Sequence, residues 1–442
     1  MSLELHDIQG LVLSAYPHLP WGRYVFLRID DLPTARQWLD GLAAAVTTAA
    51  DPKESTACNV ALSFAGMERL GLAPDALATL PRPLQQGMAS EYRSRILGDS
   101  GAGAPSRWRW GGPGAGPEVL LAVYAADPAG LVDVGALAPG FTAIASVDSL
   151  LLPYSLEHFG FTDGVSQPVL DGTRRAAESA ASSEEVIAPG EFLLGYPDES
   201  GRRAEGPTVA ADRSSSVLAP APGGAGRRDL GRNGSYLVVR QLAQDVAAFG
   251  RFVDGDDRLA AEMVGRWPNG APLALAPDEQ DDGLSSANDF GYEGDKHGLR
   301  CPLGAHIRRA NPRNSTTKTD AGSEETARRS ANRHRILRRG RPYGPADPAA
   351  NDERGLMFLA LNADVERQFE FVQHTWLNNP TFAGLSGEVD PLTGDQPAGG
   401  GIFSEQALPV RRRHSGIANF VTTRGGAYFF LPGVTALRWL VS

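Results

Sequence analysis

Cysteine and long apolar runs are scarce in this sequence. The 442 residues include two cysteines, Cys58 and Cys301, too few for a disulfide framework or a four-thiolate metal site. The apolar run 119–126 is far shorter than the ~20 residues that a membrane-spanning helix needs. The first residues contain neither the basic nor the apolar segment of a secretory signal. We therefore expect a cytoplasmic protein with no membrane partner.

Positive charge is also in short supply. The chain has 42 Lys and Arg against 52 Asp and Glu, which gives a net charge of -10. Proteins that bind nucleic acids mainly through the phosphates are normally basic, so this composition predicts no nucleic-acid partner. Apolar residues make up 42% of the chain and charged residues 21%, which is ordinary for a globular protein with a buried core.

Several common catalytic motifs are missing as well. The sequence has no GxxxxGK[ST] phosphate loop, no CxxC, no HExxH and no GxSxG. The eight histidines are scattered, and none lies three or four residues from another. A zinc site made of neighbouring ligands is therefore not expected.

A pattern of strand followed by helix occurs twice. Residues 24–28 are rich in β-forming side chains and precede an amphipathic helix predicted over 32–42. Residues 236–240 repeat the strand pattern, and a second amphipathic helix is predicted over 242–252. The repetition indicates two copies of one α+β unit.

The polar segment 202–232 is the predicted linker between the two copies. It divides the chain into an N-terminal domain, 1–215, and a C-terminal domain, 216–442. Two other polar stretches, 173–186 and 313–333, are predicted loops or insertions. Further strands are predicted at 59–64, 119–124, 357–361 and 426–432, and a further helix over 365–376.

One candidate site surrounds an aspartate between two glycines. In the run 160–164, Gly-Phe-Thr-Asp-Gly, the glycines would let the backbone approach a flat ligand closely, and Asp163 would project from a rigid turn. The alternative is an ordinary β-turn with Asp-Gly at its tip. Read alone, the segment favours the ordinary turn.

A second candidate site centres on a lone histidine, His306, which precedes three arginines, Arg308, Arg309 and Arg313. A single histidine is a common way to bind haem iron from one side, and arginine matches the carboxylates of a cofactor. The alternative is a buried core histidine beside a solvated basic surface. A third segment, 333–344, is strongly basic, and a surface helix end or an RNA-binding surface both fit it.

Together, these segments resemble the dye-decolorizing (DyP-type) haem peroxidases. The family hallmark GxxDG corresponds to 160–164, the segment of the iron-binding histidine to 304–313, and the Arg-Arg-Gly of the distal arginine to 338–340. Similarity extends to four further segments, 7–10, 368–373, 376–378 and 428–430. The resemblance spans nearly the whole chain, and the long polar insertions resemble those of the larger members.

The resemblance implies an α+β fold made of tandem duplicated ferredoxin-like domains, with antiparallel sheets and peripheral helices, similar to the dimeric α+β barrel superfamily. It also implies one haem b per chain, held mainly against the second domain. The activity would be reduction of hydrogen peroxide coupled to one-electron oxidation of bulky dyes or phenolic compounds. The partners would be peroxide and an aromatic reductant, and the chain a monomer or a homodimer.

The resemblance assigns roles to particular residues. His306 would bind the iron, with the carboxylate of Asp364 on its other ring nitrogen, although Asp364 also fits a helix N-cap. Asp163 would act as the base toward peroxide, which predicts an acidic optimum for dye oxidation because aspartate stays ionised in acid. Arg338 would stabilise negative charge on the peroxide oxygens. Two other arginines compete with Arg338 for this place, Arg335 and Arg339.

The other haem contacts that the resemblance implies are Gly164, Val165, Ser166, Asn311, Pro312, Arg313, Leu356 and Phe358. Of these, Arg313 would meet a haem propionate, and Leu356 and Phe358 would wall the distal pocket. Surface aromatic residues would pass electrons from bulky dyes, with Trp376 and Tyr343 as candidates. Two other functions stay open, a protein that releases iron from haem and a haem-free α+β binding module, for example for RNA.

Overall fold

The structure is a computed structural model that describes residues 2–51, 54–114, 116–131, 138–178, 186–224, 226–315, 323–347 and 352–442. Its centre is a nine-stranded antiparallel sheet that closes on itself, because β9 pairs with both β15 and β12. In spatial order the strands are β10 (Leu337–Arg338), β12 (Gly355–Asn362), β11 (Arg341–Tyr343), β4 (Phe141–Leu150), β1 (Trp21–Ile29), β3 (Val119–Ala125), β2 (Thr56–Leu62), β15 (Val421–Leu431) and β9 (Ser235–Gln244).

Both halves of the chain contribute strands to this one sheet. The first half supplies β1 to β4, and the second half supplies β9 to β12 and β15. The halves meet where Tyr343 of β11 pairs with Ser149 of β4, and where Phe430 of β15 pairs with Leu62 of β2. The predicted α+β fold with antiparallel sheets and peripheral helices is confirmed. The division at residues 215 and 216 stays a prediction.

The two predicted copies of the strand and helix unit are present. β1 is followed by α1 (Leu32–Ala45), and β9 by α8 (Val246–Val253). Each helix begins at an aspartate whose side chain accepts an N–H from the first turn: Asp31 from Thr34, and Asp245 from Ala248. The prediction that the second helix starts at residue 242 was wrong, because β9 continues to Gln244 and keeps pairing with β15.

Most strands of the sheet bury both of their faces, whereas β4 is only partly buried. On β1, Val25 and Leu27 belong to one apolar cluster, which also includes Leu39 of α1 and Leu437 of α12 (Val434–Val441). The alternate side chains of β1, such as Phe26, belong to a second cluster with residues of most other strands of the closed sheet. This two-sided burial explains why the strand sequences are nearly continuous apolar runs.

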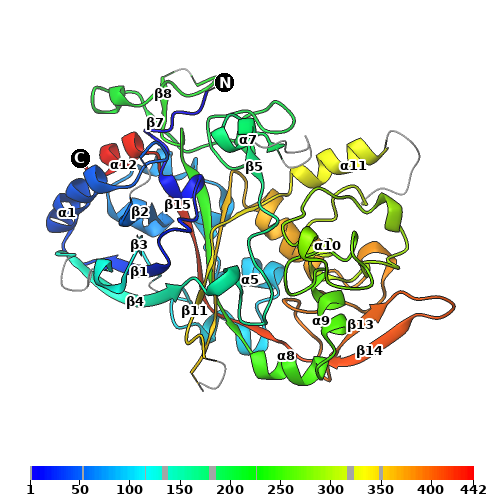
Figure 1. Ribbon diagram of the computed structural model, residues 1–442. Coiled ribbons are helices and arrows are strands. Elements are labelled where there is room, and N and C mark those ends of the chain that lie inside the picture. The colour runs from blue at the N-terminus through cyan, green and yellow to red at the C-terminus, as the bar shows by residue number, and fades with distance from the viewer. Residues whose placement is uncertain are drawn as a thin grey trace.

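The remaining elements surround the sheet, and Figure 1 shows α8 to α11 and the hairpin β13–β14 gathered on one side of it. Their bounds are α2 (Phe64–Arg69), α3 (Pro74–Leu77), α4 (Arg82–Gln86), α5 (Glu91–Leu97), α7 (Arg174–Glu178), α9 (Asp257–Val264), α10 (His306–Ala310), α11 (Ser323–Asn332), β5 (Val169–Leu170), β6 (Val186–Ile187), β7 (Thr208–Ala210), β8 (Arg227–Asp229), β13 (Gly401–Glu405) and β14 (Arg412–Ile417). Among the described residues, no helix is both long and apolar enough to span a bilayer.

The other sequence-based expectations have mixed outcomes. The strands predicted at 119–124 and 357–361 lie within β3 and β12. The helix predicted over 365–376 consists of two π-helical segments, Glu366–Glu370 and Val372–Leu377. The insertion 313–333 contains α11, and its residues 316–322 lie outside the described residues, as do residues 179–185 of the loop 173–186.

Candidate functional site

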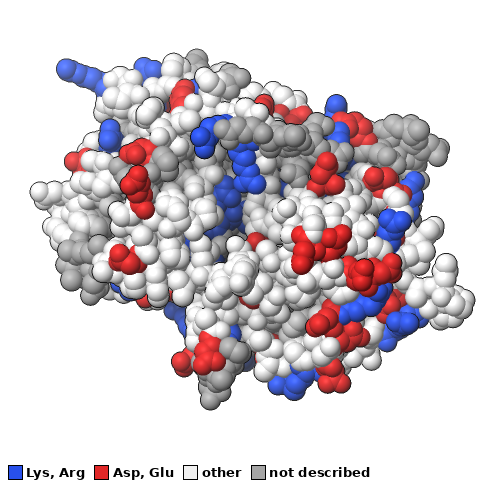
Figure 2. All heavy atoms as spheres, viewed as in Figure 1, with Lys and Arg blue, Asp and Glu red and all other residues white. Residues whose placement is uncertain are grey.

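A large cavity lies between the closed sheet and the surrounding helices and loops. It encloses about 320 Å³ of space that a water molecule can reach. The loop 157–166, strands β9, β10 and β12, and helix α10 all contribute to its wall. The charged and titratable side chains that line it are Asp99, Glu157, Asp163, Arg240, Arg266, His306, Arg335, Arg338 and Asp395. Figure 2 shows one face of the molecule, where basic side chains lie inside a central hollow.

His306 is the first residue of α10, and its imidazole lines the cavity. Its Nδ1 lies 2.9 Å from Oδ2 of Asp390, whose side chain is fully buried, whereas the His306 side chain is 28% accessible. Burial alone would lower the pKa of His306, but the Asp390 carboxylate outweighs it and raises that pKa. A proton held on Nδ1 leaves the lone pair on Nε2, the nitrogen that a metal ion in the cavity would use.

The carboxylate of Asp390 is itself firmly held. Oδ1 accepts hydrogen bonds from the backbone N–H groups of Leu392 (3.1 Å) and Thr393 (2.8 Å) and from the Thr393 hydroxyl (3.0 Å). Although burial opposes ionisation, the His306 imidazole and these N–H groups hold the pKa of Asp390 below its ordinary value. Asp390 therefore stays an acceptor toward His306 and fixes the orientation of the ring.

The prediction that Asp364 is the partner of His306 was wrong. The Asp364 side chain is 43% exposed, and its Oδ1 accepts the N–H of Arg367 at 3.0 Å, as an N-cap does. Sequence reasoning missed Asp390, which is 84 residues from His306. Its run Asp-Pro-Leu-Thr reads as an ordinary turn, so no local signal distinguishes it.

Two arginines after His306 anchor its helix rather than face a ligand. Arg308 is 2% exposed and pairs with Asp295 at 2.9 Å. Arg309 is fully buried and donates to the backbone oxygen of Glu388 at 2.6 Å, two residues before Asp390. Arg309 thus connects the helix of the histidine to the segment of its carboxylate partner. Neither arginine belongs to a solvated basic surface.

Asp163 and Arg338 form an ion pair in the wall of the same cavity. Oδ1 of Asp163 accepts from Nη1 of Arg338 at 2.9 Å and from the backbone N–H of Gly164 at 2.7 Å. Burial would raise the pKa of Asp163, but Arg338 and the Gly164 N–H outweigh burial and hold that pKa below its ordinary value. Oδ2 carries no hydrogen bond from any residue that the structure describes. One oxygen of an ionised carboxylate is therefore available toward the cavity.

Gln167 is a site residue that sequence reasoning did not single out. Its Oε1 accepts the backbone N–H of Arg338 at 3.1 Å, which ties the Asp163 segment to β10. Of the two competing arginines, Arg339 donates to the backbone oxygens of Leu11 and Val12, whereas Arg335 lines the cavity. Arg338 is the arginine that bonds Asp163.

Some of the residues predicted to contact the haem line the cavity, and others do not. Six of them line the cavity: Gly164, Val165, Ser166, Asn311, Leu356 and Phe358. Pro312 and Arg313 are not among the described residues that line it, and their contact with a haem stays a prediction. Arg313 donates to the backbone oxygens of Asn288 (2.8 Å) and Phe290 (2.9 Å), and its guanidinium lies 3.9 Å from the centre of the Phe290 ring.

The cavity has the chemistry that a flat, largely apolar group with a polar rim requires. Apolar walls come from Leu356, Phe358 and Val165. A Cβ on Gly164 would meet no other residue within 4 Å, so the cavity is open beside the backbone there. Buried polar atoms of cavity-lining side chains find no partner among the described residues, for example Asp99 Oδ2, Arg240 Nε, Gln244 Oε1 and Asn311 Nδ2. These residues fit a haem whose iron would meet Nε2 of His306.

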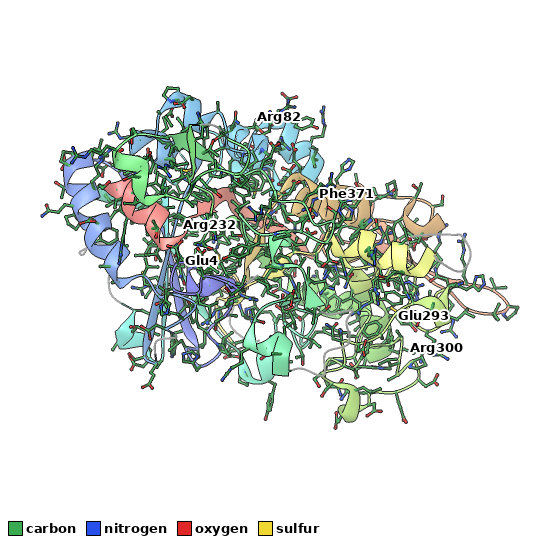
Figure 3. The ribbon with its side chains drawn as sticks, turned by 90° about the horizontal axis from the view of Figure 1, so that it is seen from above. Glu4, Arg82, Arg232, Glu293, Arg300 and Phe371 are labelled. Atoms are coloured by element: carbon green, nitrogen blue, oxygen red, sulfur yellow. The ribbon has the colours of Figure 1, made fainter. Side chains whose placement is uncertain are left out.

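The candidates for passing electrons at the surface are both buried. Trp376 is 7% exposed and Tyr343 is 6% exposed, so the prediction that they are surface residues was wrong. The Trp376 ring packs edge-on against Phe371, which Figure 3 labels, with ring centres 5.3 Å apart. Val372 and Leu377 of the same segment line the cavity.

Comparison with known proteins relates the whole chain to peroxidases that act on dyes. Residues 204–408 match the family model "Dyp-type peroxidase, C-terminal". The chain is 31% identical to dye-decolorizing peroxidase msp1 of Mycetinis scorodonius, over 100% of this chain and 88% of that protein. It is 29% identical to the multifunctional dye peroxidase DyP2 of an Amycolatopsis species, over 94% and 91%.

Solved structures of such peroxidases are also similar to this chain. An Anabaena DyP-type peroxidase superposes with a TM-score of 0.78 at 25% identity, covering 99% of this chain and 94% of that one. An ancestral D-type dye-decolorizing peroxidase gives a TM-score of 0.79 at 26% identity, covering 99% of both chains. The chain belongs to the dye-decolorizing (DyP-type) peroxidase family.

Proposed function

We propose that this peroxidase binds one haem b per chain in the cavity and uses His306 as the iron ligand and Asp163 with Arg338 as the groups that act on peroxide. The family activity is reduction of hydrogen peroxide with oxidation of dyes and phenolic compounds. The observation that supports the proposal is the gathering of a carboxylate-bonded imidazole and a carboxylate–guanidinium pair in one cavity.

Haem iron, when bound, supplies the two-electron reduction of peroxide and the two one-electron oxidations of the reductant. Oδ2 of Asp163 accepts a proton from one peroxide oxygen and returns it to the other, which leaves as water. The Arg338 guanidinium stabilises the negative charge that develops as the oxygen–oxygen bond breaks.

The His306–Asp390 pair acts from the iron side. Asp390 holds the Nδ1 proton and increases the basicity of Nε2, the nitrogen that would bind the iron of a haem. Overall, one hydrogen peroxide, two protons and two electrons give two water molecules, and two reductant molecules each lose one electron.

A visible spectrum of the purified chain tests this proposal. With ample haem during expression we expect a strong Soret band that shifts when hydrogen peroxide is added. A protein that releases iron from haem would lose the band with little oxidation of reductant. A chain that takes up no haem would contradict the proposal.

A further inference from the structure

Glu157 is a carboxylate in the cavity wall that the chemistry above does not use. It lies six residues before Asp163 and lines the same cavity. Among the described residues, no Lys, Arg or His forms an ion pair with it. Burial raises the pKa of Glu157 and outweighs the N–H groups that its oxygens accept. A partly buried carboxylate without a cation is costly, so its presence here calls for a physical reason.

The backbone around Glu157 forms a loop that closes on itself. The N–H of Glu157 donates to the oxygen of Phe161, and the N–H of Gly160 donates to the oxygen of Glu157, both at 2.9 Å. At the end of the loop, the N–H of Asp163 donates to the oxygen of Ser155, also at 2.9 Å. The position of Asp163 therefore depends directly on the shape of this loop.

The Glu157 carboxylate occupies the inside of the loop. Oε1 accepts the backbone N–H of Phe161 at 3.0 Å, and Oε2 accepts the N–H of Phe159 at 3.0 Å. Oε2 also accepts the side-chain amide of Gln244 at 2.6 Å. Because Gln244 ends strand β9, this third bond fixes the loop to the closed sheet.

The backbone of this loop is strained, and the hydrogen bonds that Glu157 accepts help to hold it. Tyr154 and Ser155 both have left-handed backbones, with φ of 58° and 56°, although neither is glycine. Such backbone conformations are unfavourable for residues that carry a Cβ and persist only where the surroundings hold them. Ser155 supplies the oxygen that binds the N–H of Asp163. If the Glu157 bonds were lost, relaxation at Ser155 would move Asp163.

We propose that Glu157 is a positioning residue for the peroxide reaction, whose carboxylate fixes the loop 153–163 on strand β9 and so keeps Asp163 beside Arg338. The inference rests on the proposed role of Asp163. Glu157 itself touches neither peroxide nor the cofactor in this account.

A positioning role and a simple charge effect predict opposite results. Asp163 is faced by Arg338 of β10, His306 of α10 and Glu157 of its own loop. If Glu157 acts by position, its removal separates Asp163 from Arg338, and the pKa of Asp163 rises toward the ordinary value. If Glu157 acts only through its negative charge, its removal lowers the pKa of Asp163.

The test is Glu157→Gln, which keeps the shape but cannot accept all three N–H groups. The Asp163 pKa is measured in the full chain by ¹³C NMR of labelled aspartate carboxyls, with Asp163→Asn to assign the signal. We expect the pKa to rise and, in the haem-loaded enzyme, the rate constant with peroxide to fall about 10- to 100-fold. Gln244→Leu, which removes a single bond, should shift both in the same direction by less.

Asp198→Asn is the matched control. Asp198 also organises a loop, with bonds from the N–H of Ser200 and of Arg202, but it does not line the cavity. It should change neither quantity. An unchanged or lowered Asp163 pKa in folded Glu157→Gln and Gln244→Leu variants would overturn the positioning role. Because the NMR measurement needs no turnover, it remains decisive even if Asp163→Asn shows that Asp163 has no part in the peroxide reaction.

Discussion

The two carboxylates of the site are held in opposite ways. Asp390, the partner of His306, is fully buried, and hydrogen bonds engage both of its oxygens. Asp163, the partner of Arg338, keeps 35% of its side chain accessible, and both hydrogen bonds that it accepts from the described residues go to Oδ1. The same chemical group is thus immobilised in one place and left with a spare oxygen in the other.

This difference separates a carboxylate that orients the His306 ring from one that can react with a small molecule. A carboxylate with both oxygens engaged can orient an imidazole and hold its proton, but it has no position left for a substrate. A carboxylate with one open oxygen can exchange a proton with a small molecule. The pKa of each lies below its ordinary value, so both stay ionised in mild acid, and accessibility rather than charge distinguishes them.

Removing the imidazole should have the largest effect on the site. We expect His306→Ala to weaken haem binding by more than about 100-fold. Substitution of a residue that only hydrogen-bonds a metal ligand usually costs about 10- to 100-fold, and loss of the ligand itself should cost more. The haem content per chain, from the Soret absorbance, measures this. His374→Ala is the control, since His374 is exposed and does not line the cavity. Full haem content in His306→Ala would contradict the assignment of His306 as the iron ligand.

Neutralising the open carboxylate should slow the chemistry and leave haem binding intact. We expect Asp163→Asn to reduce the rate constant for the reaction with peroxide by about 10²- to 10⁴-fold, the usual range for a general acid–base group. Asp171→Asn is a matched control, because Asp171 also precedes a glycine whose N–H it accepts, at 2.8 Å, but is exposed and outside the cavity. Equal rate constants in the two variants would show that accessibility does not mark the reacting carboxylate.

Neutralising the immobilised carboxylate should have the complementary effect. We expect Asp390→Asn to weaken haem retention by about 10- to 100-fold through a misoriented imidazole. Transfer of haem to an excess of a haem-scavenging protein gives the retention. A variant that keeps its haem as the unaltered chain does, and reacts with peroxide at the same rate, would contradict the supporting role of Asp390.

Asp364, the carboxylate that sequence reasoning favoured, gives the smallest expected effect. Its bond to the N–H of Arg367 makes it an N-cap, so Asp364→Ala should cost about 1 kcal/mol of unfolding free energy. Denaturant unfolding measures that loss. Haem retention and the peroxide rate constant should stay unchanged, and a loss of haem here would favour Asp364 over Asp390 after all.

Much of the fold could be predicted from the sequence because strands and helices leave periodic patterns. The repeated strand of residues 24–28 and 236–240 lies within β1 and β9. The end of β9 was missed, since Leu242, Val246 and Phe249 also follow the i, i+4, i+7 spacing of an amphipathic helix. Closure of the sheet by the β9–β12 pairing joins distant segments, and no local pattern encodes it.

The site was predictable where the motif and the geometry coincide. Asp163, His306 and Arg338 lie in runs that identify a family, and all three line the cavity. Asp390 lies in an ordinary turn and gains its role only through its contact with His306 in the folded chain. Arg313 fits a cofactor carboxylate by residue type, and its Nη1 donates to the backbone oxygens of residues 288 and 290, contacts that no local pattern encodes.

The most direct test of the account is the rate constant for hydrogen peroxide, measured by stopped-flow from about pH 3 to pH 8 in the haem-loaded chain and in Asp163→Asn. Because Arg338 and the Gly164 N–H hold the Asp163 pKa below its ordinary value, the unaltered chain should keep its rate constant down to about pH 4 and lose it only below that. The variant should be slow and nearly independent of pH. Identical pH profiles for the two proteins would contradict the assignment of Asp163 as the base.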